Sequence, residues 1–231
     1  MLWCRSLIFN LCFWAWTIGL GLLALPLLLM GSALSKEHIP SLWVNGVLML
    51  LKRICRIDYV VEGDVPDRAV VYASKHQSAF ETLAFWKILN KPAFILKREL
   101  LWIPVFGWYL ALTRPIAIDR GAGAAALKQV IRECGEKLAH GQSVVIFPEG
   151  TRTRPGEQKP YQPGIAAIYA MQSPTVVPIA LNSGRFWSKN SFIKRPGTVH
   201  IQILNAMPAQ MEKKEFLTHL QEAIEQASAS L

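Results

Sequence analysis

The sequence predicts an α/β fold that follows an N-terminal helical segment associated with a membrane. Residues 6–35 contain no charged side chain. After residue 58, short apolar runs typical of strands recur, and helical segments fall between many of them. The clearest helical segment is Ala124–Ala139, where apolar side chains form one stripe and Gly141 follows. These three observations favour an apolar appendage followed by an α/β domain.

The bulk composition bounds the class of protein. A chain of 231 residues holds one ordinary globular domain plus an appendage. Its 25 Lys and Arg residues against 16 Asp and Glu give a net charge of +9, which suits nucleic acid, an anionic membrane surface or a phosphorylated substrate. The hydrophobic share of 52% and the positive mean hydropathy favour the membrane. The four cysteines form no CxxC pair or Cys/His cluster, so we expect neither a zinc site nor a disulfide framework.

The apolar run Ser6–Ser35 is long enough to cross a bilayer, whose core takes roughly 20 apolar residues. Pro26 and two glycines interrupt the run, which allows either one kinked span or a re-entrant hairpin. A signal peptide is the alternative, because Arg5 is basic and Gly31-Ser32-Ala33 resembles a cleavage site. The run exceeds the usual apolar region of about 7–15 residues in signal peptides, so we predict a retained anchor.

Residues 42–56 predict an amphipathic helix with a basic end at Lys52, Arg53 and Arg56. Such a helix could lie in the membrane interface, with its basic end toward lipid phosphates. It could equally be a core helix whose basic end is solvated. Because the basic residues after the apolar run outnumber Arg5 before it, the positive-inside rule places the rest of the chain in the cytoplasm.

The chain is therefore predicted to divide into an anchor with an interfacial helix, residues 1–57, and a globular domain, residues 58–231. In the second region a last amphipathic helix over residues 212–227 closes the core. Gly121-Ala122-Gly123 lacks the third glycine and the leading strand of a dinucleotide-binding turn. The predicted strands are Tyr59–Val61, Ala69–Ala73, Ala93–Leu96, Ile116–Ile118, Ser143–Phe147, Thr175–Ala180 and Thr198–Leu204.

The stretch Ser74–Thr82 places an imidazole at a strand end and a carboxylate five residues later. In a continuous helix the side chains of His76 and Glu81 would lie apart, so they can meet only if His76 lies in the turn before the helix. Ser78 is a good N-cap and would start the helix there. The pair could then act as a general base and its orienting carboxylate. As the alternative, Ser78-x-x-Glu81 is a capping box with a structural role alone.

The segment Phe147–Arg152 directly follows a predicted strand, where α/β sheets present ligand loops. Pro148 and Gly150 fix a special turn, while Thr151 and Arg152 supply a hydroxyl group and a bidentate anion clamp. A strand-ending turn with a surface arginine is the alternative.

Two basic residues, Lys97 and Arg120, also lie at the ends of predicted strands. They could converge on one phosphate group. Each could also belong to an ordinary solvated run of charges.

Together these segments have the order and spacing of four motifs. They are His76-x4-Glu81, the block from Lys97 to Arg120, Phe147–Arg152 and Val177-Pro178-Ile179. In this the chain resembles the 1-acyl-sn-glycerol-3-phosphate acyltransferase (lysophosphatidic acid acyltransferase) family of glycerolipid acyltransferases, over about Val60–Ala180. It departs from the usual pattern at one place, because the family usually has His-x4-Asp and this chain has Glu81.

The resemblance implies an αβ sandwich with a mostly parallel sheet and an acyltransferase catalytic domain over residues 58–231. The implied reaction moves an acyl chain from acyl-CoA or acyl-carrier protein to the sn-2 hydroxyl of 1-acyl-sn-glycerol-3-phosphate, making phosphatidic acid. His76 would take the hydroxyl proton, and Glu81 would hold the imidazole in the right tautomer. The implied substrate-binding residues are Lys97, Arg120, Glu149, Gly150, Thr151 and Arg152, of which Glu149–Thr151 would shape their loop.

The resemblance also implies the partners and the place of the reaction. No metal or redox cofactor is needed. The partners would be membrane phospholipid, lysophosphatidic acid and the acyl donor, with no nucleic acid among them. The catalytic domain would lie on the cytoplasmic side of the inner cell membrane. Two alternatives are a different lysolipid acceptor and a non-catalytic lipid-binding membrane protein in which Glu81 is only a cap.

Overall fold

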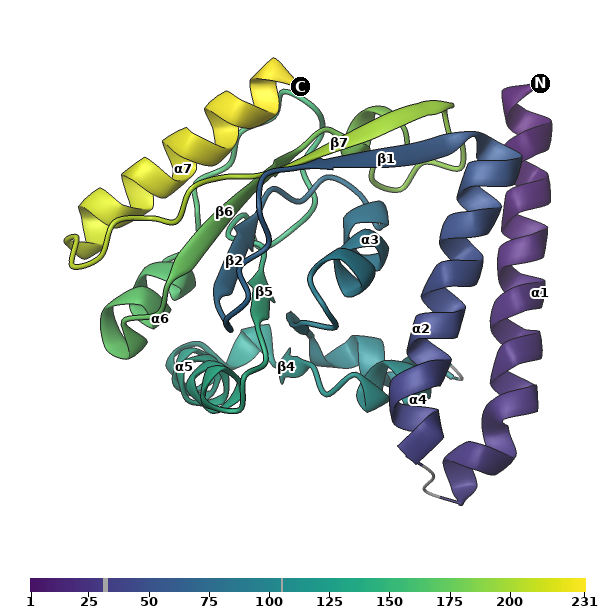
Figure 1. Ribbon diagram of the computed structural model, residues 1–231, viewed down its shortest axis with the longest axis horizontal. Helices are drawn as coiled ribbons and strands as arrows, with labels where there is room; N and C mark the ends of the chain where they lie inside the picture. The colour runs from purple at the N-terminus through teal and green to yellow at the C-terminus, as the bar shows by residue number, and fades with distance from the viewer. Residues whose placement is uncertain (31–32, 105) are drawn as a thin grey trace.

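The computed structural model describes residues 1–30, 33–104 and 106–231 (Figure 1). Among these residues, one sheet of seven strands lies between two layers of helices. β7 runs antiparallel to β6 and parallel to β1, and all other neighbouring strands are parallel. The predicted α/β fold with a mostly parallel sheet is therefore confirmed. Across the sheet the strands are β1 (Ile57–Glu62), β7 (Gly197–Ile203), β6 (Val176–Leu181), β2 (Val71–Ser74), β5 (Val144–Ile146), β3 (Ala93–Lys97) and β4 (Ile116–Ile118).

The central strands are continuous apolar runs because helices cover both of their faces. Every residue of β2, β5 and β6 is buried. The edge strand β1 instead exposes its last three residues. All the strands lie within two residues of their predicted bounds.

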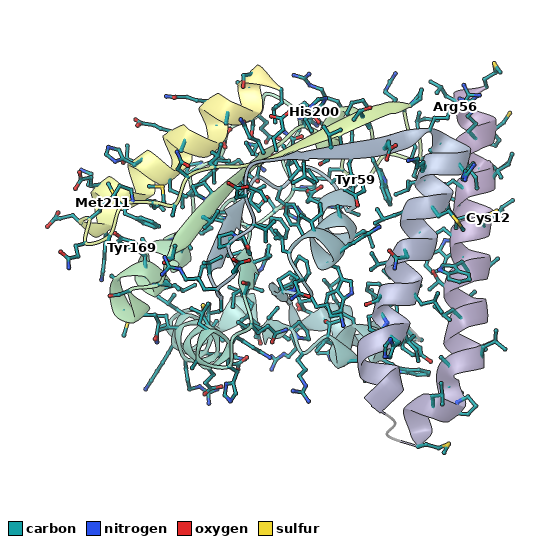
Figure 2. The ribbon with its side chains drawn as sticks, in the orientation of Figure 1. Cys12, Arg56, Tyr59, Tyr169, His200 and Met211 are labelled. Atoms are coloured by element: carbon teal, nitrogen blue, oxygen red, sulfur yellow. The ribbon has the colours of Figure 1, made fainter. Side chains whose placement is uncertain are left out.

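One face of the sheet is covered by α5 (Ala124–Ala139), α6 (Gly164–Gln172) and α7 (Lys213–Ser230) (Figure 1). Tyr169 of α6 joins this layer to the segment before α7, where it lies beside Met211 (Figure 2). Its hydroxyl oxygen accepts the Met211 N–H at 2.9 Å.

The opposite face is covered by α3 (Phe80–Ile88), whose side chains Phe80, Leu83 and Phe85 are buried in the same core as the N-terminal helices. Shorter helical segments follow three of the strands at one edge of the sheet. They are η2 (Arg98–Trp102) and α4 (Phe106–Leu112) after β3, η3 (Arg120–Ala122) after β4 and η4 (Ser183–Arg185) after β6.

The N-terminal region is a pair of helices, α1 (Leu2–Leu29) and α2 (Ala33–Leu50), which lie side by side and run in opposite directions (Figure 1). Pro26 lies in the last turn of α1, so the helix continues past the predicted interruption. The segment Leu2–Leu27 is long and apolar enough to cross a membrane, by length and composition. Gly31 and Ser32 of the possible cleavage site lie outside the described residues.

Of the two interpretations of residues 42–56, an interfacial helix or a core helix, the packing of α2 agrees with the core helix. Val44 and Val47 are buried, and so is Leu51 in the π-helical turn η1 (Leu51–Cys55) that follows. Lys52 is exposed at the end of the helix and forms an ion pair of 2.7 Å with Asp58. The division of the chain at residue 57 stays a prediction.

Two tryptophan side chains tie α1 to α2. The indole N–H of Trp16 donates to the backbone oxygen of Trp43 at 3.2 Å. The indole N–H of Trp43 in turn donates to the hydroxyl of Thr17 at 3.0 Å. Because both donors are paired within the hairpin, the two helices are held in a fixed register.

Lys194, in the loop before β7, ties the first turns of α1 to the globular domain. Its backbone N–H donates to Ser6 Oγ at 2.9 Å. Its buried ammonium group lies 5.1–5.6 Å from the ring centres of Phe9, Trp187 and Phe192. These contacts attach the N-terminal part of α1 to the globular domain.

The contact between α1 and α2 gives a first prediction. A Cβ added at Gly46 of α2 would overlap the Trp16 ring. Gly46→Ala is therefore expected to force the helices apart and lower the free energy of unfolding by about 1–3 kcal/mol, the usual cost of overpacking. Thermal unfolding in detergent measures this. Gly19→Ala in α1 is the matched control, because an added Cβ there meets none of the described atoms within 4 Å. An equal fall in the free energy of unfolding in both variants would contradict the prediction.

Candidate active site

The residues singled out from the sequence gather at one edge of the sheet. His76 follows β2, Phe147–Arg152 follows β5, Lys97 ends β3 and Arg120 follows β4. These strands are parallel neighbours, so their carboxyl ends lie side by side. A cavity of about 1130 Å³ lies at this edge, and His76 is part of its wall.

His76 and Glu81 are in contact, as the spacing of the motif allows. His76 lies in the turn after β2, Glu81 lies in the first turn of α3, and Nδ1 is 2.9 Å from Oε1. An ionised carboxylate can only accept, so a neutral imidazole in this bond carries its proton on Nδ1 and has its lone pair on Nε2. The imidazole stacks on Phe147 with ring centres 3.9 Å apart, and its side chain is 16% exposed. The arrangement provides a basic nitrogen beside the cavity.

The Glu81 carboxylate also holds the start of α3. Its Oε1 accepts the backbone N–H groups of Gln77 and Ser78, each at 2.7 Å. The Ser78 hydroxyl oxygen accepts the Phe80 N–H at 3.1 Å, and the helix begins at Phe80, two residues after the predicted start. The capping interaction and the contact with His76 therefore coexist on one oxygen atom.

The peptide groups of His76 are held by the loop after β5. Glu149 Oε2 accepts the His76 N–H at 2.9 Å, and the Thr153 N–H donates to the His76 carbonyl at 2.8 Å. Glu149 Oε1 lies 2.6 Å from the Lys75 ammonium nitrogen, which also contacts Glu225 Oε1 at 2.7 Å and Oε2 at 2.8 Å. Lys75 is 1% exposed, so these contacts replace its hydration.

This buried cluster carries two carboxyl groups around one ammonium group. Burial raises the pKa of the Glu149 carboxyl, while the adjacent Lys75 ammonium acts in the opposite direction. The Tyr161 hydroxyl donates to Glu225 Oε1 at 3.1 Å, and burial raises the pKa of that phenol. Glu149 thus binds internal partners on both of its oxygen atoms.

The predicted anion-binding residues are distributed around the cavity. Lys97, Arg120, Gly150 and Thr151 line it, and so does Glu149. The Arg120 guanidinium donates to the Gly150 carbonyl, which brings that charge to the loop after β5. Lys97 is half exposed and forms an ion pair of 3.0 Å with Glu99. Arg152, at the end of the loop, is not among the lining residues.

Lys189 was missed by the sequence analysis. Its ammonium group donates to Thr151 Oγ at 3.1 Å, so the Thr151 hydroxyl hydrogen remains free to donate elsewhere. Lys189 lies beyond the four motifs, in a loop whose sequence has no regular period. A basic residue shortly after the strand β6 was the one available signal.

The rest of the cavity wall is mostly apolar and comes largely from the helices on the α3 face. α1 contributes to it directly, and the Tyr109 hydroxyl of α4 donates to the Gly21 carbonyl of α1 at 2.7 Å. The apolar lining includes Phe13, Leu20, Trp43, Val44, Leu83, Trp86, Phe106 and Leu110. Among the described residues, no three His, Cys, Asp or Glu side chains are placed to hold a metal ion.

Comparison with known proteins agrees with this fold. A family model described as "Acyltransferase" matches residues 36–182, more than half of the chain. In structure, the chain is similar to the 1-acyl-sn-glycerophosphate (LPA) acyltransferase PlsC from Thermotoga maritima. The TM-score is 0.76, with 22% identity, over 100% of this chain and 97% of that chain. This likeness shows the fold.

The sequence relatives narrow the family. A 1-acyl-sn-glycerol-3-phosphate acyltransferase of Pseudomonas aeruginosa is 38% identical over 79% of this chain and 72% of its own length. The corresponding alpha protein of Homo sapiens is 26% identical over 84% of this chain and 70% of its own. A relative from Cocos nucifera is 28% identical, and this chain spans 54% of it.

The protein is thus an acyltransferase by its family match, and its fold agrees. Within that class the chain belongs to the 1-acyl-sn-glycerol-3-phosphate acyltransferase family, and the resemblance seen in its motifs is confirmed.

The buried cluster behind His76 gives a second prediction. Lys75→Met would leave Glu149 and Glu225 without their cation, so we expect the free energy of unfolding to fall by about 3–5 kcal/mol. Thermal unfolding measures the change. Lys128→Met, at an exposed position on α5, is the control, and its free energy of unfolding should equal that of the unchanged protein. A Lys75→Met protein as stable as this control would show that the cluster does not need the ammonium group.

Proposed function

We propose that the protein transfers an acyl group from a thioester, acyl-CoA or acyl-carrier protein, to the sn-2 hydroxyl of 1-acyl-sn-glycerol-3-phosphate. The product is phosphatidic acid, and the reaction is a step of phospholipid biosynthesis. The observation that carries the proposal is the contact of 2.9 Å between His76 and Glu81 beside an apolar cavity of about 1130 Å³. Membership of the acyltransferase family supports it.

His76 acts as the general base through Nε2. This nitrogen takes the proton of the sn-2 hydroxyl while the hydroxyl oxygen attacks the thioester carbonyl carbon. The carbon–sulfur bond then breaks, the new ester bond remains, and the imidazolium returns the proton to the departing thiolate. Glu81 keeps the Nδ1–H tautomer and stabilises the imidazolium by its charge. We assign no step to a metal ion or a redox cofactor.

The phosphate of the acceptor binds at the basic part of the cavity. Arg120 and Lys97 face it from the ends of two strands, and Thr151 offers its hydroxyl hydrogen. Arg152, at the end of the same loop, does not line the cavity, so its role in phosphate binding rests on the motif alone. Glu149 and Gly150 act by shaping that loop, since the Glu149 carboxylate binds Lys75 and the His76 N–H.

The acyl chains occupy the apolar part of the cavity, and the protein works at a membrane. α1 has an outward face of exposed apolar side chains, suited to lipid rather than water. We place the catalytic domain on the cytoplasmic side of the inner cell membrane, where thioester donors are available, on the basis of the positive-inside rule. The outward residues include Trp3, Leu11, Trp14, Leu22 and Leu23.

The sequence left two alternatives: a non-catalytic protein in which Glu81 is only a cap, and an enzyme with a different lysolipid acceptor. A purely structural Glu81 is disfavoured, because the oxygen atom that caps α3 also contacts His76. A different lysolipid acceptor is tested with purified protein by thiol release on a panel of lysolipids. Preference for a free phosphate monoester over the same lysolipid with an esterified phosphate supports our acceptor.

The general base gives a third prediction. His76→Ala should lower kcat by about 10²–10⁴-fold while the protein still folds, because the change removes the base and leaves the sheet and its helices in place. Thiol release with acyl-CoA measures the rate. Glu81→Gln should also lose most of its rate, since an amide cannot stabilise an imidazolium by charge. A fully active Glu81→Gln protein would contradict the pairing, and a fully active His76→Ala protein would contradict the mechanism.

The phosphate site gives a fourth prediction. Charge-assisted hydrogen bonds are worth about 1.5–3 kcal/mol each, so Arg120→Ala should raise the acceptor KM by roughly one to two decades. The donor KM should change little. Steady-state kinetics with each substrate varied in turn measure both constants. Arg132→Ala is the control, because Arg132 is exposed on α5 and does not line the cavity. A selective rise in the donor KM would instead assign Arg120 to the carrier of the thioester.

A further inference from the structure

We propose that Ser183 is a positioning residue that holds Glu81 against His76. The inference rests on the proposed role of His76 as the general base. Ser183 follows β6 and begins the short helix η4, just beyond the stretch matched by the family model. Its hydroxyl donates to Glu81 Oε2 at 2.7 Å, and both residues are 0% exposed.

The two oxygen atoms of Glu81 have different partners. Oε1 is shared by His76 Nδ1 and by the backbone N–H groups of Gln77 and Ser78. These three donors belong to one short loop and move with it. Among the described residues, Ser183 is the donor to Oε2, and it belongs to η4, the short helix that follows β6. It therefore fixes the carboxylate relative to the sheet, whereas the other donors fix it relative to the loop.

Ser183 is itself held in place. Its backbone oxygen accepts the N–H groups of Phe186 at 3.1 Å and Trp187 at 3.0 Å. The next residue, Gly184, donates its N–H to Gln77 Oε1 at 2.9 Å, so two adjacent residues of η4 bind the segment from Gln77 to Glu81. A Cβ added at Gly184 would lie 2.9 Å from the Gln77 Cβ, which shows how closely these two segments pack.

The longer side chain of Glu81 is the reason why a second hydrogen-bond donor is needed to hold its carboxylate. Glutamate has one more rotatable bond than aspartate, so its carboxylate is fixed less by the backbone alone. A second donor from outside the loop removes that freedom. In Glu81→Asp the side chain is shorter by roughly one bond length, about 1.5 Å, so a carboxylate that keeps its contacts with the loop would lie out of reach of the Ser183 hydroxyl. The hydroxyl should thus matter for the longer side chain only.

A double-mutant cycle tests this inference, with kcat, both KM values and the unfolding midpoint measured for each protein. Ser183→Ala in the native chain should lower kcat by about tenfold or more, the effect of losing one charge-assisted hydrogen bond, with both KM values changed less than about twofold. In the Glu81→Asp background the same substitution should change kcat by less than about twofold. Equal factors in both backgrounds, or no fall in the native chain, would overturn the inference.

Two controls complete the experiment. Ser188→Ala removes a hydroxyl from the same loop that donates to the Gly184 carbonyl at 2.6 Å, and it should leave kcat unchanged. If Ser183→Ala does not fold, Ser183→Cys replaces it in the cycle, since it keeps the size of the side chain and a weak donor. His76→Ala separates the two proposals. An active His76→Ala protein overturns the general-base role. If His76→Ala is inactive but Ser183→Ala lowers kcat by the same factor in the native and Glu81→Asp backgrounds, the positioning role alone is overturned.

Discussion

The ammonium group of Lys75 joins the loop that carries His76 to two segments distant in the sequence. It contacts Glu149 in the loop after β5 and Glu225 in α7, and Glu149 accepts the N–H of His76. A buried ammonium group needs such partners, because its desolvation costs several kcal/mol. The position of the imidazole therefore depends on the complete sheet and on the last helix, and not on its own loop alone. The same cluster links the base to the anion-binding loop, so the two halves of the site are fixed relative to each other.

Glu81 shows how one side chain can satisfy a structural and a chemical requirement together. Helix α3 needs acceptors for its first N–H groups, and an imidazole base needs an acceptor for Nδ1–H. The turn after β2 brings both kinds of donor to one oxygen atom. The choice between a cap and an orienting carboxylate, which is open in the sequence, is therefore not an exclusive one. The extra methylene of glutamate is accommodated because the Ser183 hydroxyl, just after β6, donates a hydrogen bond to the second oxygen atom.

The sequence was informative where the physical cause is local. The apolar runs and their period located the strands and the bounds of α5. They did so because a strand or helix face that packs against the core carries apolar side chains. The start of α2 was placed too late, since Pro40 usually breaks a helix and here lies within one. Contacts between residues far apart in the sequence could not be predicted. Lys75 and Glu225 are 150 residues apart, and no local pattern marks either as a partner of the other. Lys189 reaches Thr151 for the same reason.

The helix α1 has two faces with different neighbours. Phe13, Thr17 and Leu20 line the cavity, while Trp14 and Leu22 on the same helix are exposed. This has a practical consequence for anyone who wants a water-soluble form of the enzyme. Deleting the helix would open the wall of the cavity, so the usual removal of an apolar N-terminus is the wrong approach. Replacing its outward side chains with polar ones would keep the wall intact and change only the solvent in which the enzyme can be handled.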